Sequence, residues 1–233
     1  MKKTLFFVLL LTVLMAVAPV PGFAARPRLN PRLQTYAKAR VAEFNQIPAE
    51  RRAELRKLAD YVRAQRAAGK PADLLFVCTH NSRRSHISQL WAQAASAYYG
   101  VANVRTWSGG TEATNFNVNA VAALERAGFD IRKTSEGSNP LYDVHYTVDG
   151  DGYKAFSKKY SDPVNPQDNF AVVMTCANAD RSCPNVHGAS LRIAAHYDDP
   201  KASDGTSRQN ATYDDCVRQI AREMLYTFSL LRS

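Results

Sequence analysis

From Ala72 onward, short apolar runs alternate with amphipathic helical patterns. Four runs have the length and composition of buried strands: residues 74–77, 104–107, 170–175 and 191–194. Three segments place apolar residues at helical spacing: residues 85–99, 117–127 and 213–231. Parallel strands need crossover connections, which helices normally supply. The alternation therefore predicts an α/β domain, a four-stranded parallel sheet with helices on both faces, and residues 142–169 are expected to be an inserted loop region.

Residues 1–25 join two lysines to an apolar run and end in small residues, which is the layout of a secretory signal peptide. An uncleaved membrane anchor is the alternative, but the apolar run is short and contains Pro19 and Pro21 close to its end. We therefore expect cleavage, export to an oxidising compartment such as the periplasm, and no stable membrane span in the mature chain.

Residues 26–71 are predicted to form a helical hairpin whose second helix opens at Pro48. A hairpin of about forty residues is too small for a convincing core of its own, which favours a cover on the domain of residues 72–233. Much of the formal net charge of +9 lies in this segment. A basic face can meet nucleic acid or lipid headgroups, but a solvated face is commoner. Because no nucleic-acid motif or zinc-ligand spacing accompanies it, no nucleic-acid partner, metal or cofactor is predicted.

The first apolar run ends in the sequence CTHNSRRS, residues 78–85, and a helical pattern begins at once. In such a turn the backbone N–H groups point inward and the helix N-terminus adds positive potential, which together can hold a tetrahedral anion. Arg84 adds a planar guanidinium able to bind two oxygens. The same field stabilises a thiolate, so Cys78 is expected to be a nucleophile near neutral pH. The residues expected to surround the anion are Thr79, His80, Asn81, Ser82, Arg83, Arg84 and Ser85.

The string FVCTHNSRRS resembles the signature of low-molecular-weight protein tyrosine phosphatases and of the thioredoxin-coupled arsenate reductases that share their fold. The resemblance covers about residues 74–231 and includes WSGGTEA near Ser108. It implies the low-molecular-weight phosphatase fold and identifies HYDDPKASDGT as the acid loop of both branches, with Asp199 as general acid. Two departures stand in the signature: His80 replaces a usual Gly, and Arg83 replaces a frequent second Cys.

The segment VMTCANADRSCPN carries Cys176 and Cys183 and resembles the redox segment of the arsenate reductases, which the tyrosine phosphatases are not expected to have. It implies arsenate reduction by a Cys78–Cys176–Cys183 relay, with a thioredoxin-like protein as final reductant. The alternative is hydrolysis of phosphotyrosine or another phosphomonoester through a phosphocysteine at Cys78. A third hypothesis is a non-catalytic oxyanion-binding or redox-sensing domain fused to the helical hairpin. Cys216 is assigned no chemistry, because its helical spacing places it toward the core.

Overall fold

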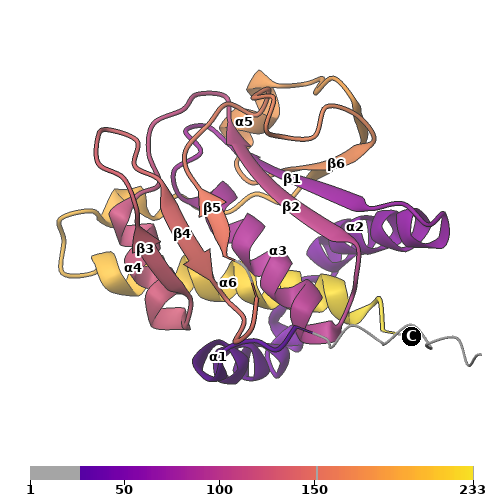
Figure 1. Ribbon diagram of the computed structural model, residues 1–233, viewed down its shortest axis with the longest axis horizontal. Coiled ribbons are helices and arrows are strands. Elements are labelled where there is room, and N and C mark those ends of the chain that lie inside the picture. Colours follow the sequence, from indigo (N-terminus) through magenta and orange to yellow (C-terminus); the bar gives the residue numbers. More distant parts are fainter. Residues whose placement is uncertain (1–26, 151, 233) are drawn as a thin grey trace, which may run out of the picture.

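The computed structural model describes residues 27–150 and 152–232, and a four-stranded parallel sheet lies at its centre (Figure 1). Its strands stand in the spatial order β2-β1-β6-β7: β1 (Ala72–Cys78), β2 (Val104–Gly110), β6 (Phe170–Met174) and β7 (Ala189–Ala194). All three strand pairs are parallel, as predicted from the alternation of strands and helices. The predicted signal peptide, residues 1–25, lies outside the described residues.

The two faces of the sheet are covered unequally. Alternate residues of β1 enter different cores: Leu74 and Phe76 enter a large one, whereas Leu75 and Val77 enter a small one. The large core lies under α3 (Arg84–Tyr99), α4 (Val118–Ala127), α6 (Gln209–Ser229) and the N-terminal helices. The small core lies under α5 (Ala177–Ser182), which contacts β1 and β6. Helices therefore cover both faces, as predicted, but the three helices predicted for this domain all lie on the large-core face. Within the described residues, the second face has only α5, a short helix that the sequence patterns did not predict.

The N-terminal segment forms α1 (Pro31–Val41), a 3₁₀ turn η1 (Phe44–Gln46) and α2 (Ala49–Ala67). The side chain of Asn30 caps α1 by accepting a hydrogen bond from Leu33 N–H at 2.9 Å. α1 packs on α6, and α2 packs on α6, β7 and β1 (Figure 1). Both helices thus rest on the α/β domain. Within the described residues, none of the helices is long and apolar enough to cross a membrane.

The region 142–169 is not a loop throughout, which corrects the sequence prediction. β4 (Tyr142–His145) pairs with β3 (Asp130–Lys133) on one side and with β5 (Tyr153–Ala155) on the other, in a separate antiparallel sheet of order β3-β4-β5. Asp143 and Lys154 stand opposite one another in this sheet and form an ion pair. Such charged pairs break the apolar run that marks a buried strand, so pattern reading missed these strands.

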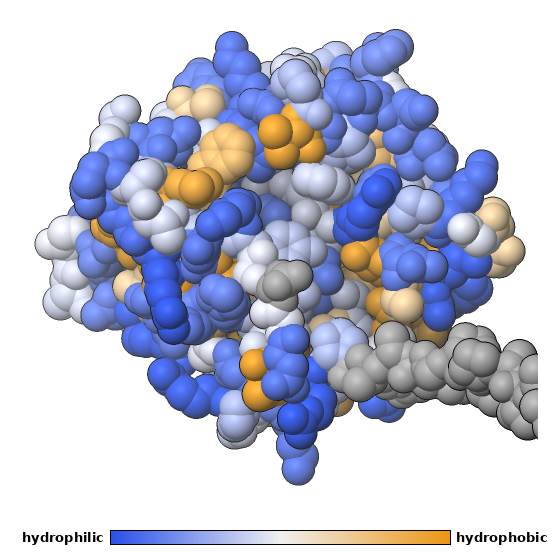
Figure 2. All heavy atoms as spheres, in the orientation of Figure 1, coloured by the Kyte–Doolittle hydropathy of each residue, from blue (hydrophilic) through white to orange (hydrophobic). Residues whose placement is uncertain are grey.

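The surface in the orientation of Figure 1 is mainly hydrophilic, with apolar side chains in small separate groups (Figure 2). Part of the N-terminal positive charge is paired with carboxylates, and Arg40 takes part in the most buried of these clusters. Glu43 follows α1 and exposes only 7% of its surface. It accepts hydrogen bonds from Arg218 of α6, the shortest 2.7 Å long, and pairs with Arg40 at 2.9 Å and Arg222 at 3.8 Å. Burial acts to raise the pKa of Glu43, but the arginines outweigh it and hold that pKa below 4.5.

Replacing Glu43 by Gln should lower the free energy of unfolding by about 2–3 kcal/mol, because three partly buried guanidinium groups lose their carboxylate. Denaturant unfolding measures the free energy of unfolding of wild type and Glu43→Gln. Glu54→Gln is the control, because it removes only an exposed ion pair with Lys57. Because the pKa of Glu43 is lower in the folded than in the unfolded protein, its ionised carboxylate stabilises the fold fully at pH values above the unfolded-state pKa. This contribution to the free energy of unfolding is lost as the pH falls through the folded-state pKa. The difference from wild type should therefore shrink in acid. Equal effects of the two substitutions would contradict this account.

Candidate active site

The loop that joins β1 to α3 presents its carbonyl groups outward. Three of them accept hydrogen bonds from the segment after β2: that of Cys78 from Thr111 N (3.1 Å), that of Thr79 from Glu112 N (2.8 Å) and that of Ser82 from Asn117 N (2.9 Å). Within the described residues, the N–H groups of residues 79–83 donate to no protein acceptor. The loop is thus a set of unpaired donors just before the N-terminus of α3, as an oxyanion site requires.

Asn81 fixes the shape of this loop. Its φ of +44° is one that few residues other than glycine adopt, and Asn tolerates it better than most. Its fully buried side chain donates to Ser85 Oγ at 2.8 Å and accepts from the N–H of Lys158 at 2.8 Å. Ser85 Oγ in turn lies 3.1 Å from the sulfur of Cys78. The loop, the first turn of α3 and the candidate nucleophile are therefore connected by hydrogen bonds.

Gly110, at the end of β2, allows the loop to approach the sheet this closely. A Cβ at this position would lie 2.6 Å from Asn81 N and 2.7 Å from the carbonyl oxygen of Thr79. Both distances are too short for a side chain, so only glycine fits. The second glycine of the WSGGTEA string thus has a physical role in forming the anion loop.

Arg84 lies between two groups of the segment that follows β7. Its guanidinium donates to the carbonyl of Tyr197 at 3.0 Å and to Asp199 Oδ2 at 2.7 Å. Asp199 also caps the 3₁₀ turn η2 (Pro200–Ser203), because its Oδ1 accepts from Lys201 N–H at 3.1 Å. The structure therefore brings the predicted general acid to the predicted anion-binding arginine. A bound oxyanion would compete with Asp199 for this guanidinium.

The other polar residues of the loop have different surroundings. Arg83 donates to Tyr213 Oη at 2.8 Å and lies 3.5 Å from Asp204, so its guanidinium is engaged near α6. His80 is partly exposed, with its Nε2 3.6 Å from Glu112. Of the two arginines in the loop, Arg84 is the one that lines the cavity described next.

A cavity of about 240 Å³ brings Arg84 and Asp199 together with Cys176. The sulfur of Cys176 lies 3.5 Å from Thr79 Oγ1, and Thr79 directly follows Cys78. This proximity arises from the sheet, because β1 and β6 are neighbours that end at the same edge. The cavity thus holds a second thiol beside the candidate anion site.

The four cysteines are divided between the two cores. Cys78, Cys176 and Cys183 belong to the small core, whereas Cys216 belongs to the large one. Cys176 and Cys183 flank α5 at its N-terminal and C-terminal ends, respectively. Burial raises the pKa of Cys216 to about 12, as expected for a thiol without a chemical role.

Sequence reasoning missed the support that α2 gives to the site. Arg51 donates to the carbonyl of His196 at 2.5 Å, and its guanidinium lies 5.3 Å from the ring centre of Tyr197. The hydroxyl of Tyr197 donates to Glu223 at 2.9 Å, and burial together with the Glu223 charge raises the pKa of this tyrosine. These contacts fix the carbonyl that holds Arg84. No local signal in the sequence distinguishes Arg51 from the other basic residues around it.

No family model matches the sequence. Among curated proteins, it is similar to an arsenate reductase from Bacillus subtilis strain 168, with 30% identity over 156 residues, 67% of this chain and 94% of that protein. An arsenate reductase from Brevibacillus brevis is 32% identical over 128 residues, 54% of this chain and 75% of that protein. A low-molecular-weight phosphotyrosine phosphatase structure from Vibrio cholerae covers 70% of this chain and 97% of its own, with 13% identity and a TM-score of 0.47. The family assignment therefore rests on the sequence relatives and not on this structural likeness.

Substitutions at Asn81 should separate backbone strain from hydrogen bonding in the loop. Asn81→Gly keeps the positive φ accessible but loses the bonds to Ser85 and Lys158, so the affinity for phosphate or arsenate should fall about tenfold. Asn81→Ala loses the same bonds and adds strain of about 1 kcal/mol, so it should also have the lower Tm. Calorimetric titration with phosphate and thermal unfolding provide both readouts. Unchanged phosphate affinity in both variants would show that Asn81 does not shape the site.

Proposed function

The chain belongs to the arsenate reductase branch of the low-molecular-weight protein tyrosine phosphatase superfamily, and we propose on this basis that it reduces arsenate to arsenite by a relay of three thiols. It is a cysteine-dependent oxyanion enzyme, and the relay specifies which cysteines act. The observation that carries the proposal is the cavity that places Cys176 beside Arg84 and Asp199. A phosphatase mechanism has no use for a thiol at that position.

In the first step, arsenate binds to the unpaired N–H groups of residues 79–83 and to the guanidinium of Arg84. The Cys78 thiolate attacks arsenic and forms a sulfur–arsenic bond. One arsenic–oxygen bond breaks, and Asp199 gives its proton to the departing oxygen, which leaves as water. Ser85 Oγ, 3.1 Å from the Cys78 sulfur, helps to hold the thiolate in position. The product of this step is an arsenic(V) adduct on Cys78.

In the second step, the Cys176 thiolate attacks the sulfur of Cys78. The electron pair of the sulfur–arsenic bond passes to arsenic, which leaves as arsenite, and a Cys78–Cys176 disulfide forms. The contact between Cys176 and Thr79 supports this step, because it places the attacking sulfur against the residue next to Cys78. At rest, the sulfur of Cys176 accepts a hydrogen bond from Ala179 N–H at 3.4 Å, which holds this side chain at the start of α5.

In the third step, Cys183 attacks the sulfur of Cys176, so that the Cys78 thiolate is released and a Cys176–Cys183 disulfide forms. A thioredoxin-like dithiol then reduces this disulfide and becomes oxidised itself. The two cysteines flank α5, and positions seven apart on a helix are separated by about 10 Å. A disulfide needs Cα atoms about 4.4–6.8 Å apart. The third step therefore requires α5 to unwind.

Two side chains outside α5 control this unwinding. Arg192 of β7 donates to the carbonyl of Cys183 at 3.1 Å and to that of Asp180 at 2.7 Å, and it also pairs with the Asp180 carboxylate. His196 Nε2 lies 2.9 Å from the same carboxylate. Their contacts with Asp180 and the Cys183 carbonyl must break or rearrange before Cys183 can reach Cys176.

Hydrolysis of phosphomonoesters is the second candidate function. The position of Cys183 favours it, because this thiol is separated from Cys176 in the folded protein by the length of α5. Cys78, Arg84 and Asp199 would suffice for hydrolysis, with a phosphocysteine at Cys78 and Asp199 acting first as acid and then as base for water. The purified protein therefore needs to be assayed for aryl phosphate hydrolysis and for arsenate-dependent thioredoxin oxidation in parallel.

Replacing Cys183 by Ser should abolish repeated arsenate turnover with thioredoxin but leave one turnover per protein molecule, because the first two steps do not use this thiol. Arsenite release measured against protein concentration gives that stoichiometry. Cys216→Ser is the matched control, since this buried thiol lies in the other core, and it should keep multiple turnovers. Undiminished multiple turnover in Cys183→Ser would disprove the relay.

We also propose that residues 1–25 direct export and that the mature enzyme works in the periplasm, with a thiol reductant available there. The support is the composition of this segment, two lysines followed by an apolar run and small residues. Expression of the full-length chain in a Gram-negative host should yield periplasmic protein whose mass corresponds to loss of about 25 residues. Recovery of the chain with Met1 in the cytoplasmic fraction would contradict export.

A further inference from the structure

A second cavity, of about 450 Å³, lies between β2, β5 and α3 and shares no lining residue with the cavity of Cys176. In Figure 1, β5 stands beside β2 with α3 next to both. The apolar part of its wall consists largely of aromatic rings, those of Trp107, Tyr153 and Phe156. Its volume is in the range of small-molecule sites, which are mainly apolar with a few placed polar groups.

Lys158 is the unusual member of this wall. It exposes only 6% of its surface, and among the described residues its ammonium has no hydrogen bond or ion pair. Its Nζ lies 4.9 Å from the ring centre of Phe156. Burial lowers the pKa of Lys158 to about 8, so the group is still mainly charged at neutral pH. The nearby carboxylate of Asp162 offsets part of the cost of burying this charge, and an anion in the cavity would offset more of it.

The other cations at this cavity already have partners. Arg105 forms a two-bond pair with Asp73, at 2.6 and 2.5 Å, and Lys154 pairs with Asp143. Within the described part of the chain, Lys158 is thus the cation of this cavity that forms no ion pair, and the carboxylate of Asp162 is the opposite charge that acts on it. Aromatic walls around a single cation match a ligand that has a flat ring and one negative group.

We propose that this cavity is a binding site for a small aromatic anion, separate from the Cys78 site and anchored by the ammonium of Lys158. The site is also connected to the catalytic loop, because the backbone N–H of Lys158 donates to the side chain of Asn81. A ligand on Lys158 would thus lie next to the segment that fixes the anion loop.

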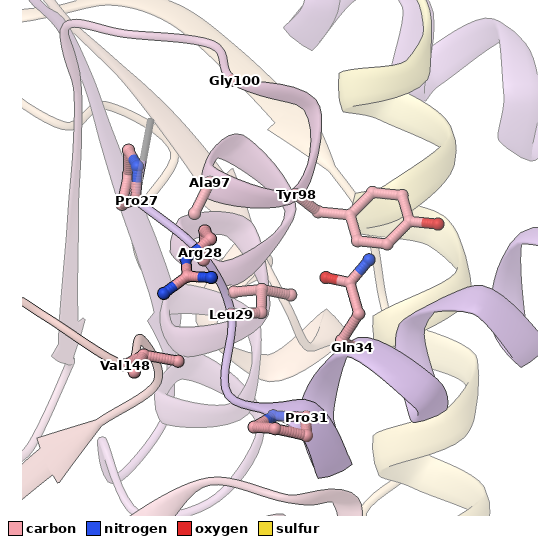
Figure 3. Close-up of a pocket in the computed structure, with 9 residues that line it drawn as sticks. All are labelled: Pro27, Arg28, Leu29, Pro31, Gln34, Ala97, Tyr98, Gly100 and Val148. Atoms are coloured by element: carbon pink, nitrogen blue, oxygen red, sulfur yellow. The ribbon is translucent and has the colours of Figure 1, made fainter. Parts of the chain in front are cut away.

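A competing surface is an apolar groove of about 510 Å³ between the start of α1 and the end of α3 (Figure 3). Its charged side chain, Arg28, is well exposed and lies 3.4 Å from Asp149. The groove has no buried polar group aimed into it among its lining residues, which include Leu29, Tyr98 and Val148. It therefore shows no chemistry that would select a ligand, and it provides a control surface.

The aromatic sulfonate 8-anilinonaphthalene-1-sulfonate is a suitable probe, because its fluorescence rises in apolar sites. Lys158→Met should weaken its binding about tenfold or more, as expected for loss of a charge-assisted contact, whereas Lys158→Arg should retain most of the affinity. Lys154→Met, in the same wall but already paired, and Val148→Asp, in the groove of Figure 3, should change the affinity by less than about twofold.

Unfolding cannot mimic the expected loss, because partly unfolded proteins bind more of this dye. Saturating phosphate, which occupies the Cys78 site, should leave the dye in place. Full displacement of the dye by phosphate would overturn the proposal, and so would equal affinities of the wild type and Lys158→Met. Failure of the dye to bind the wild-type protein at millimolar concentration would overturn it as well. These outcomes do not depend on arsenate turnover, so they test the Lys158 site independently of the thiol relay.

Discussion

The unpaired N–H groups between Cys78 and Arg84 are the constraint around which the rest of the structure is arranged. Buried donors without acceptors are costly, so a loop that leaves several of them free must be held by other contacts. Here its carbonyls bind the segment after β2, Asn81 joins it to α3 and Lys158, and Gly110 leaves room for its backbone. These contacts preorganise the donors, and a tetrahedral anion supplies the acceptors that they lack.

The unequal covering of the sheet gives the two faces different properties. The large core joins five helices to the sheet and positions Arg84 through Tyr197 and Arg51. The small core is covered by α5 and contains all three cysteines of the proposed relay. Segments with little buried apolar area open at low free-energy cost. A thiol pair covered by one short helix, beside an anion loop held by hydrogen bonds, suits a disulfide relay.

Local patterns sufficed to predict the parallel sheet and the anion loop, because each strand and the loop are marked by residues close together in the chain. Asp199, Cys176 and Cys183 were proposed from the resemblance to the phosphatases and reductases instead. The pairing of β3, β4 and β5 was missed because charged residues such as Asp143 and Lys154 stabilise it across strands. The roles of Arg51 and Lys158 depend on contacts with residues distant in sequence, and no spacing rule reveals them. The separation of Cys176 from Cys183 by a helix also becomes visible only in three dimensions.

The central claim is that Cys78, Cys176 and Cys183 react in that order. Arsenic gains two electrons when Cys176 attacks Cys78, and the pair Cys176–Cys183 is the disulfide that remains. The most direct measurement is mass spectrometry of the peptides from fully reduced protein after exposure to one equivalent of arsenate without reductant. The relay predicts a Cys176–Cys183 disulfide, reduced Cys78 and one arsenite released for each disulfide formed. A protein that retains four free thiols after exposure, or one whose disulfide includes Cys216, would contradict it.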